Sequence, residues 1–264
     1  MSQSLYFEEY GKPGSPVIVF LHGLMGSSRN WRSVAKALSE DYHVYALDLP
    51  EHGNSPHSEE TSTSLPEMCQ QVGGWLGRQI EGTYTLCGHS LGGKVAMLLA
   101  CTQPQNLEGL VVVDIAPRDY PPEHHLPTLD ALLALDHSSL SSRKQADEVL
   151  AEQIPNWAFR QFLLTNLIED NGVWKWRANL AALHRSMPRL SSNPLGKEDR
   201  YTGKTLFLRG GKSGYLRREH FSLVYDAFPE AEIVTLPEAG HDVHVENKVV
   251  FLAHLKNFCM DSPS

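Results

Sequence analysis

The sequence lacks the features that mark several classes of protein. It contains no run of basic residues and its formal net charge at pH 7 is −8, which excludes the basic patch of a nucleic-acid binder. No stretch stays apolar over the length that a membrane-spanning helix requires. The opening residues, MSQSLYFEEYG, show neither the basic nor the apolar part of a signal peptide. The sequence therefore predicts a cytoplasmic protein without membrane insertion and without a nucleic-acid partner.

Cysteine is scarce as well. The four cysteines, Cys69, Cys87, Cys101 and Cys259, stand far apart and match no zinc-binding spacing. This predicts reduced, buried thiols rather than a disulfide framework, and Cys87 is expected to pack in the core. The sequence also has no His-Glu-x-x-His motif, and its 13 histidines are scattered. We therefore expect no metal site.

What the sequence does contain is a repeated alternation of strand and helix patterns. Several of the β-rich segments are continuously apolar, as strands buried on both faces must be. Helical spacing separates them, for example at Trp31, Val34 and Leu38, while Ser64 and Glu67 have the spacing of a capping box. This alternation predicts an α/β fold with a mostly parallel central sheet and helices on both faces. Strands are expected at 5–10, 16–23, 43–49, 83–88, 110–115, 204–210 and 231–237.

The alternation stops between residues 117 and 202. This stretch shows helical patterns only, in the segments 127–135, 141–154, 155–167 and 178–187, and the helices are expected to be divided by Pro155, an Asn171-Gly172 turn and Pro188. Strands resume after it. We predict an α-helical cap (lid) at 117–202, inserted into one core domain made of residues 1–116 and 203–264.

The motif GHSLGG, residues 88–93, follows a predicted strand and opens a predicted helix. A serine nucleophile must present its hydroxyl beyond the backbone, and a tight turn does so only if its neighbours carry no colliding Cβ; Gly88 and Gly92 meet this demand. The turn also directs backbone N–H groups and the positive end of the helix dipole at a developing oxyanion. Ser90 is therefore the candidate nucleophile.

Two backbone amides are candidates for the oxyanion hole. The segment FLHGLMG ends an apolar strand, and its glycine lets the following backbone approach a substrate oxygen. We expect Leu24 N–H and Leu91 N–H to be the paired donors. The alternative is that His22-Gly23 forms only a turn that ends the strand.

The candidate base is His241. It lies in PEAGHDVHVE, directly after the last predicted strand, and a loop there lies at the carboxyl ends of the strands, beside the elbow. His244 is the rival histidine, although it is expected to begin the final helix. A surface role for His241 is the remaining alternative.

The motifs HGLMG, DLPEHGNS, GHSLGG and AGHDVH, in this order, resemble those of the α/β-hydrolase family with a cap domain. More narrowly, GHSLGGK, VVVDIAPRDY and GGKSGY resemble small bacterial esterases of the YbfF type. The resemblance implies a serine esterase that cleaves short-chain acyl esters, and acyl thioesters as well, through a covalent acyl-enzyme. It implies no cofactor.

One position departs from the pattern of that family. Its members usually carry an acid after the strand that here reads KTLFLRG, but the loop GKSGYL offers Ser213 and no carboxylate. Some relatives keep their acid after the neighbouring strand, where this chain has Asp114, so the resemblance assigns Asp114 to orient His241, with Ser213 as an auxiliary contact. Asp114 as a turn residue at the hinge of the cap is the alternative. Asp48, His52 and Ser55 are expected to be scaffold.

The cap is expected to form the acyl pocket, with Trp157, Phe162 and Trp174 as candidate wall residues. Packing of these aromatic side chains within the cap is the alternative. Because the elbow carries a serine, the families of this fold that use a carboxylate as nucleophile, the haloalkane dehalogenases and epoxide hydrolases, are excluded. The same triad suits a lyase, an acyltransferase or a C–C hydrolase, and a slow-turnover ligand receptor on a hydrolase scaffold stays open too.

Overall fold

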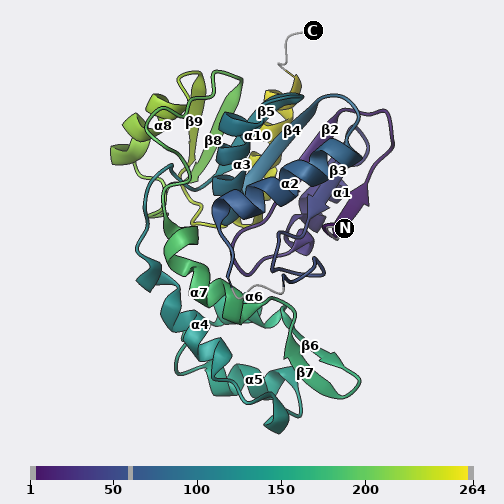
Figure 1. Cartoon of the computed structure of the whole chain (residues 1–264), viewed down its shortest axis with the longest axis vertical. Helices are drawn as coiled ribbons and strands as arrows, with labels where there is room; N and C mark the ends of the chain where they lie inside the picture. The colour runs from purple at the N-terminus through teal and green to yellow at the C-terminus, as the bar shows by residue number, and fades with distance from the viewer. Residues whose placement is uncertain (1–3, 59–61, 261–264) are drawn as a thin grey trace.

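The computed structural model describes residues 4–58 and 62–260. Its centre is a seven-stranded sheet in the order β1-β3-β2-β4-β5-β8-β9 (Figure 1). β1 runs antiparallel to β3, and the other neighbouring strands pair in parallel. Every predicted strand is present. The strands are β1 (Phe7–Tyr10), β2 (Val17–Leu21), β3 (His43–Leu47), β4 (Tyr84–His89), β5 (Leu107–Val113), β8 (Thr205–Gly210) and β9 (Ala231–Leu236).

Helices cover both faces of the sheet, as the alternation predicts. Successive side chains of a strand point to opposite faces, and β2 shows the consequence: Val19 packs in a hydrophobic cluster with α2 and α3, whereas Ile18 packs in another with α1 and α10. The fold is that of an α/β hydrolase. The helices that flank the sheet are α1 (Arg32–Leu38), α2 (Leu65–Gln79), α3 (Leu91–Thr102), α8 (Phe221–Ala227), α9 (Val243–Glu246) and α10 (Lys248–Met260).

The local signals of the sequence explain where two of these helices begin. Ser64 Oγ accepts a hydrogen bond from Glu67 N at 3.4 Å, so Ser64 caps α2 as predicted. The Glu67 side chain accepts from the Ser64 hydroxyl at 2.9 Å and not from the Ser64 backbone N–H, so the second half of the expected capping box is not formed. A 3₁₀ turn, Ser28–Trp31, precedes α1 and begins after Ser27. Trp31, the first member of the predicted apolar stripe, is fully buried.

The helices and strands between β5 and β8 lie together at one end of the molecule, below the sheet in Figure 1. It contains α4 (Leu126–Leu133), α5 (Arg143–Leu150), α6 (Trp157–Leu164) and α7 (Leu180–Ser191). The prediction of helices alone is wrong here, because β6 (Leu167–Asp170) and β7 (Val173–Trp176) form an antiparallel hairpin. Asn171 and Gly172, with φ of 52° and 79°, form its tight turn, since an Asn-Gly pair favours a two-residue hairpin.

Pro188 also departs from the prediction, because it lies inside α7 instead of ending it. A proline removes one backbone donor from a helix. The last turn is held from outside: Lys94 Nζ donates to the carbonyls of Leu190, Ser191 and Ser192 at 3.2, 2.7 and 2.6 Å. The limits 117–202 of a separate cap stay a prediction.

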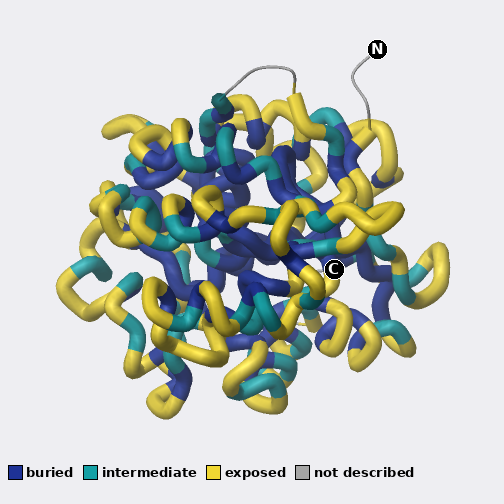
Figure 2. The backbone as a smooth tube through the Cα atoms, turned by 90° about the horizontal axis from the view of Figure 1, so that it is seen from below, coloured by how far each residue is buried: buried dark blue, intermediate teal, exposed yellow. Residues whose placement is uncertain are grey.

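Figure 2 views the molecule from the side of this inserted segment, with buried positions in the middle and exposed positions around them. The four cysteines are free thiols, and Cys87 is fully buried in the core. None of the helices in the described ranges combines the length and the apolar character needed to cross a bilayer.

Candidate active site

Ser90 stands at the turn between β4 and α3, in a backbone conformation of φ 51° and ψ −114°. The flanking glycines are sterically required. A Cβ on Gly88 would lie 2.3 Å from the carbonyl oxygen of Gly92, and one on Gly92 would lie 2.5 Å from the oxygen of Leu21. The Ser90 N–H donates to Val113 O at 3.1 Å, which fixes the turn on the neighbouring strand. The motif therefore forms the strained turn that the sequence predicts.

Asp114 and His241 are in direct contact. Nδ1 of His241 lies 2.8 Å from Oδ2 of Asp114, and the carboxylate is completely buried. The amide of Gly210 donates to the other carboxylate oxygen at 3.0 Å, and the Ser213 hydroxyl donates to Oδ2. With these donors around it, the carboxylate fixes Nδ1 of the imidazole as the protonated nitrogen, which leaves Nε2 as a proton acceptor.

His89, next to Ser90, brings the loop of His241 to the elbow. Its Nε2 lies 3.0 Å from the carbonyl oxygen of His241, and the two rings are 4.6 Å apart. Burial lowers the pKa of His89 well below its ordinary value, so the ring is neutral and acts as a donor to this carbonyl. Sequence reasoning missed this contact, because the variable position of G-x-S-x-G carries no signal for it.

Tyr215 is a second residue that sequence reasoning missed. Its ring stacks on the His241 ring at 3.9 Å and 20°, and its carbonyl accepts a hydrogen bond from Tyr120 Oη at 2.8 Å. Its place in GKSGYL, two residues after Ser213, is the only sequence signal. Tyr215 restricts the rotation of the imidazole that the carboxylate of Asp114 already orients.

The two residues with the predicted oxyanion donors lie beside Ser90. Leu24 follows β2 and Leu91 begins α3, and both line one cavity with Ser90. Neither amide donates a hydrogen bond to another residue within the described part of the chain. The loop that carries Leu24 is held by His22, whose Nδ1 lies 2.8 Å from Gly23 O and whose Nε2 accepts from Leu49 N at 2.9 Å. The arrangement leaves two free donors beside the candidate nucleophile.

Two cavities meet at Ser90. The wide cavity has a volume of about 410 Å³ and reaches Phe162 and His241. The narrow cavity has a volume of about 30 Å³ and ends at Met187 and Lys94. The Ser90 hydroxyl forms no hydrogen bond to His241 within the described ranges, and such contacts commonly tighten only when substrate binds.

Of the three predicted wall residues, only Phe162 lines a cavity. Trp157 is 65% exposed, and Trp174 is a partly buried residue of the hairpin that packs against the core. Neither lines the cavities beside Ser90, so the expectation for these two tryptophans is corrected. Trp157 opens the first turn of α6, and the hairpin turns Trp174 towards the core.

The residues predicted as scaffold have structural partners. Asp48 Oδ1 accepts from Ser28 N at 2.6 Å, and its Oδ2 accepts from Asn54 N at 2.7 Å. Ser55 Oγ donates to the Asp48 carbonyl at 2.5 Å, and His52 is fully buried.

His244, the rival histidine, is buried as well and stacks on Trp31. It lies within the short helix α9, which precedes the final helix.

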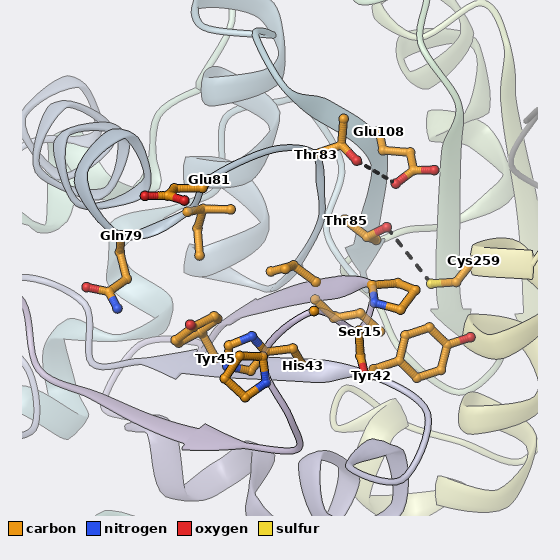
Figure 3. A pocket seen from close by; sticks show the side chains of 16 residues that line it. Ser15, Tyr42, His43, Tyr45, Gln79, Glu81, Thr83, Thr85, Glu108 and Cys259 are labelled. Atoms are coloured by element: carbon orange, nitrogen blue, oxygen red, sulfur yellow. Dashed lines mark hydrogen bonds between the residues drawn. The ribbon is translucent and has the colours of Figure 1, made fainter.

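A separate cavity of about 690 Å³ lies at the amino ends of the strands, which is the end of the sheet opposite to Ser90 (Figure 3). It contains none of the predicted site residues. Its one thiol, Cys259, points towards Thr85 at 3.9 Å, and burial raises the pKa of that thiol to about 11. A protonated thiol is a poor nucleophile, so Cys259 is not a candidate nucleophile.

Comparison with known proteins identifies the family of the chain. The model of the alpha/beta hydrolase family matches residues 18–253. The sn-1-specific diacylglycerol lipase ABHD11 of Mus musculus is 40% identical over 252 residues, covering 92% of this chain and 80% of that protein. Esterase YbfF of Escherichia coli is 30% identical over 244 residues, covering 92% and 93%. The solved structure of a marine microorganism esterase matches with a TM-score of 0.92 at 31% identity, covering 97% of this chain and 100% of the other. The chain therefore belongs to the α/β hydrolase family.

Proposed function

We propose that the protein is a serine esterase that hydrolyses short-chain acyl esters, and acyl thioesters, with Ser90 as nucleophile, His241 as general base and acid, and Asp114 as the orienting carboxylate. The observation that carries this proposal is the 2.8 Å contact between His241 and the buried Asp114. Ser90 and His241 line one cavity, and Leu24 and Leu91 line a second cavity with Ser90, which supports the same assignment. The esterase and lipase names of the relatives support the same class of reaction.

In the proposed reaction, Ser90 Oγ attacks the carbonyl carbon of the ester while His241 Nε2 accepts the hydroxyl proton. The amides of Leu24 and Leu91 donate to the resulting oxyanion. The C–O or C–S bond then breaks, and His241 returns the proton to the leaving alcohol or thiol. Water attacks the acyl-enzyme in the same way, with its proton passing through His241, which frees the acid and restores Ser90.

The segment 117–202 acts in this proposal as a cap over the site. Phe162 and other apolar side chains of α6 line the wide cavity, and apolar walls suit an organic substrate. A small-molecule ester is the only partner that the proposal requires. The location in the cytoplasm stays a prediction from the sequence.

The test is turnover of p-nitrophenyl acetate and p-nitrophenyl butyrate by the purified protein, with Ser90→Ala as the comparison. We expect many turnovers per protein molecule and a loss of at least about a thousandfold in the variant. A single stoichiometric burst without further turnover would instead favour the ligand receptor. Activity that survives in Ser90→Ala would reject the proposed nucleophile.

A further inference from the structure

The two cavities that meet at Ser90 differ in the chemistry around them. They share Leu24, Ser90, His125 and Tyr215, but only the wide cavity contains His241. Their volumes differ too, at about 410 Å³ for the wide cavity and about 30 Å³ for the narrow cavity. An ester bound with its carbonyl carbon at Ser90 must place its two halves in these two spaces.

The position of His241 decides which half goes where. A general acid must reach the oxygen or sulfur atom that leaves, and the water that later cleaves the acyl-enzyme must be activated at the same imidazole. Both events need space beside His241, which is the wide cavity. An acyl chain that filled the wide cavity would stand in the path of that water.

On this basis, and resting on the proposed function, we propose that the acyl group occupies the narrow cavity and the alcohol or thiol occupies the wide cavity. The preferred substrate is then an ester of a short acid with a large alcohol. The narrow cavity, at about 30 Å³, has less than a tenth of the volume of the wide cavity, at about 410 Å³, so it takes the shorter half of the ester. The wide cavity takes a group of drug-like size.

The narrow cavity is also held at its size. Ile115, Met187 and Leu190 give it apolar walls, and each is at least 97% buried, with relative exposures of 2%, 2% and 3%. Lys94 joins α3, which carries one wall, to the end of α7, which carries the other, through three hydrogen bonds to backbone carbonyls. A longer acyl chain would have to break this connection to make room.

The wide cavity, in contrast, is built for a larger and mainly apolar group. Met25, Leu129, Phe159, Phe162 and Leu163 line it, all of them from the loop after β2 or from the inserted segment. Phe159 is 42% exposed, so this wall reaches the surface. A bulky alcohol can enter and leave here without passing the narrow cavity.

The experiment compares two substrate series at saturating and limiting concentrations. The first varies the acyl group of p-nitrophenyl esters from acetate to hexanoate, and the second varies the alcohol of acetates from methyl to benzyl, followed in a pH-stat. We expect kcat/KM to fall about tenfold or more per methylene that the narrow cavity cannot hold. From methyl acetate to benzyl acetate we expect kcat/KM to rise. A wild-type preference for hexanoate over acetate overturns the assignment.

Two variants test the assignment of each cavity. Met187 lines only the narrow cavity, so Met187→Ala should raise the ratio of hexanoate to acetate kcat/KM at least tenfold. Phe162 lines only the wide cavity, so Phe162→Ala should lower the ratio of benzyl to methyl acetate while changing the hexanoate ratio less than threefold. The milder Met187→Val, expected to act in the same direction, serves if the alanine variant does not fold.

The outcomes separate the two proposals. If Phe162→Ala widens the acyl range and the Met187 variants do not, the acyl chain lies in the wide cavity, and the assignment fails while the esterase function stands. If no ester is turned over by the wild-type protein, the proposed function fails, and the assignment of the cavities fails with it.

Discussion

The carboxylate of Asp114 lies 2.8 Å from Nδ1 of His241, although 127 residues separate them in the chain. The acid comes from the end of β5 and the imidazole from the loop after β9. In the sheet order, only β8 stands between these two strands. The contact suits the carboxylate to the orienting role proposed for Asp114, and the effect of its loss can be measured.

Asp114→Asn should lower kcat for p-nitrophenyl acetate by about 10³ to 10⁴, because an amide favours the wrong tautomer of the imidazole. Ser213→Ala should lower kcat only about tenfold, since it removes one donor to the carboxylate and leaves the Gly210 amide in place. Circular dichroism checks that both variants are folded. The reverse order of effects would make Ser213 more important than the carboxylate and would reject the assignment.

The backbone of Ser90 predicts a stability effect that is separate from its chemistry. A non-glycine residue at φ 51° and ψ −114° is strained by about 1–3 kcal/mol, and glycine relieves this strain at an entropic cost of about 0.5–1 kcal/mol. Both Ser90→Gly and Ser90→Ala should be inactive. The free energy of unfolding, measured by urea denaturation, should be about 1 kcal/mol higher for Ser90→Gly than for Ser90→Ala. Equal stabilities would show that the turn carries no such strain.

Lys94 should make the stability of the fold depend on pH above neutrality. Its side chain is buried, and Nζ donates to three carbonyls at the end of α7. Burial lowers its pKa to about 7 from an ordinary value of 10.5, so between these values the unfolded chain binds a proton that the folded protein does not. This group should therefore raise the free energy of unfolding by about 1.4 kcal/mol per pH unit as pH increases from about 7.5 to about 9, and in Lys94→Met the slope, measured by urea denaturation, should become flatter by that amount.

Lys144 offers a matched control for this prediction. Its side chain is 85% exposed and lies 3.7 Å from Glu148, one helical turn away. Exposed pairs of this kind contribute a few tenths of a kcal/mol, so Lys144→Met should change the free energy of unfolding by less than about 0.5 kcal/mol. A pH slope that is the same in Lys94→Met as in the wild-type protein would contradict the lowered pKa of Lys94.

Buried neutral histidines make the fold sensitive to acid. Burial lowers the pKa of His244 to about 3, against an ordinary value of 6.5. Between these values the unfolded chain binds a proton that the folded protein does not, so this contribution to stability is complete above pH 6.5 and is lost as pH falls towards 3. One such histidine changes the free energy of unfolding by about 1.4 kcal/mol per pH unit.

The variant His244→Phe removes this proton and keeps an aromatic ring against Trp31, from which the His244 ring lies 4.2 Å away. The free energy of unfolding is measured by urea denaturation between pH 6 and pH 4. Its slope against pH should decrease by the contribution of one proton, about 1.4 kcal/mol per pH unit. His254→Phe, a change at a partly exposed position of α10, is the control. An unchanged slope in His244→Phe would show that His244 is not held neutral.

Local patterns predicted the strands of the central sheet and the residues of the elbow, because each depends on neighbours in the chain. Gly88 and Gly92 are examples: their contacts at 2.3 and 2.5 Å follow from a tight turn, which the motif itself encodes. The β6–β7 hairpin was missed because its strands have four residues each, which is too few for the alternation at Trp174 and Trp176 to stand out. The Asn171-Gly172 pair favours a hairpin, but by itself it also fits a turn between two helices.

By itself, the sequence determined the α/β alternation and the tight turn at Ser90, since burial periodicity and steric demand act over a few residues. Only the tertiary structure decided that His89 holds the loop of His241, that Tyr215 stacks on its ring, and that two unequal cavities meet at Ser90. These features join segments far apart in the chain. Their geometry arises when the sheet and the inserted segment pack together, and no local pattern records it.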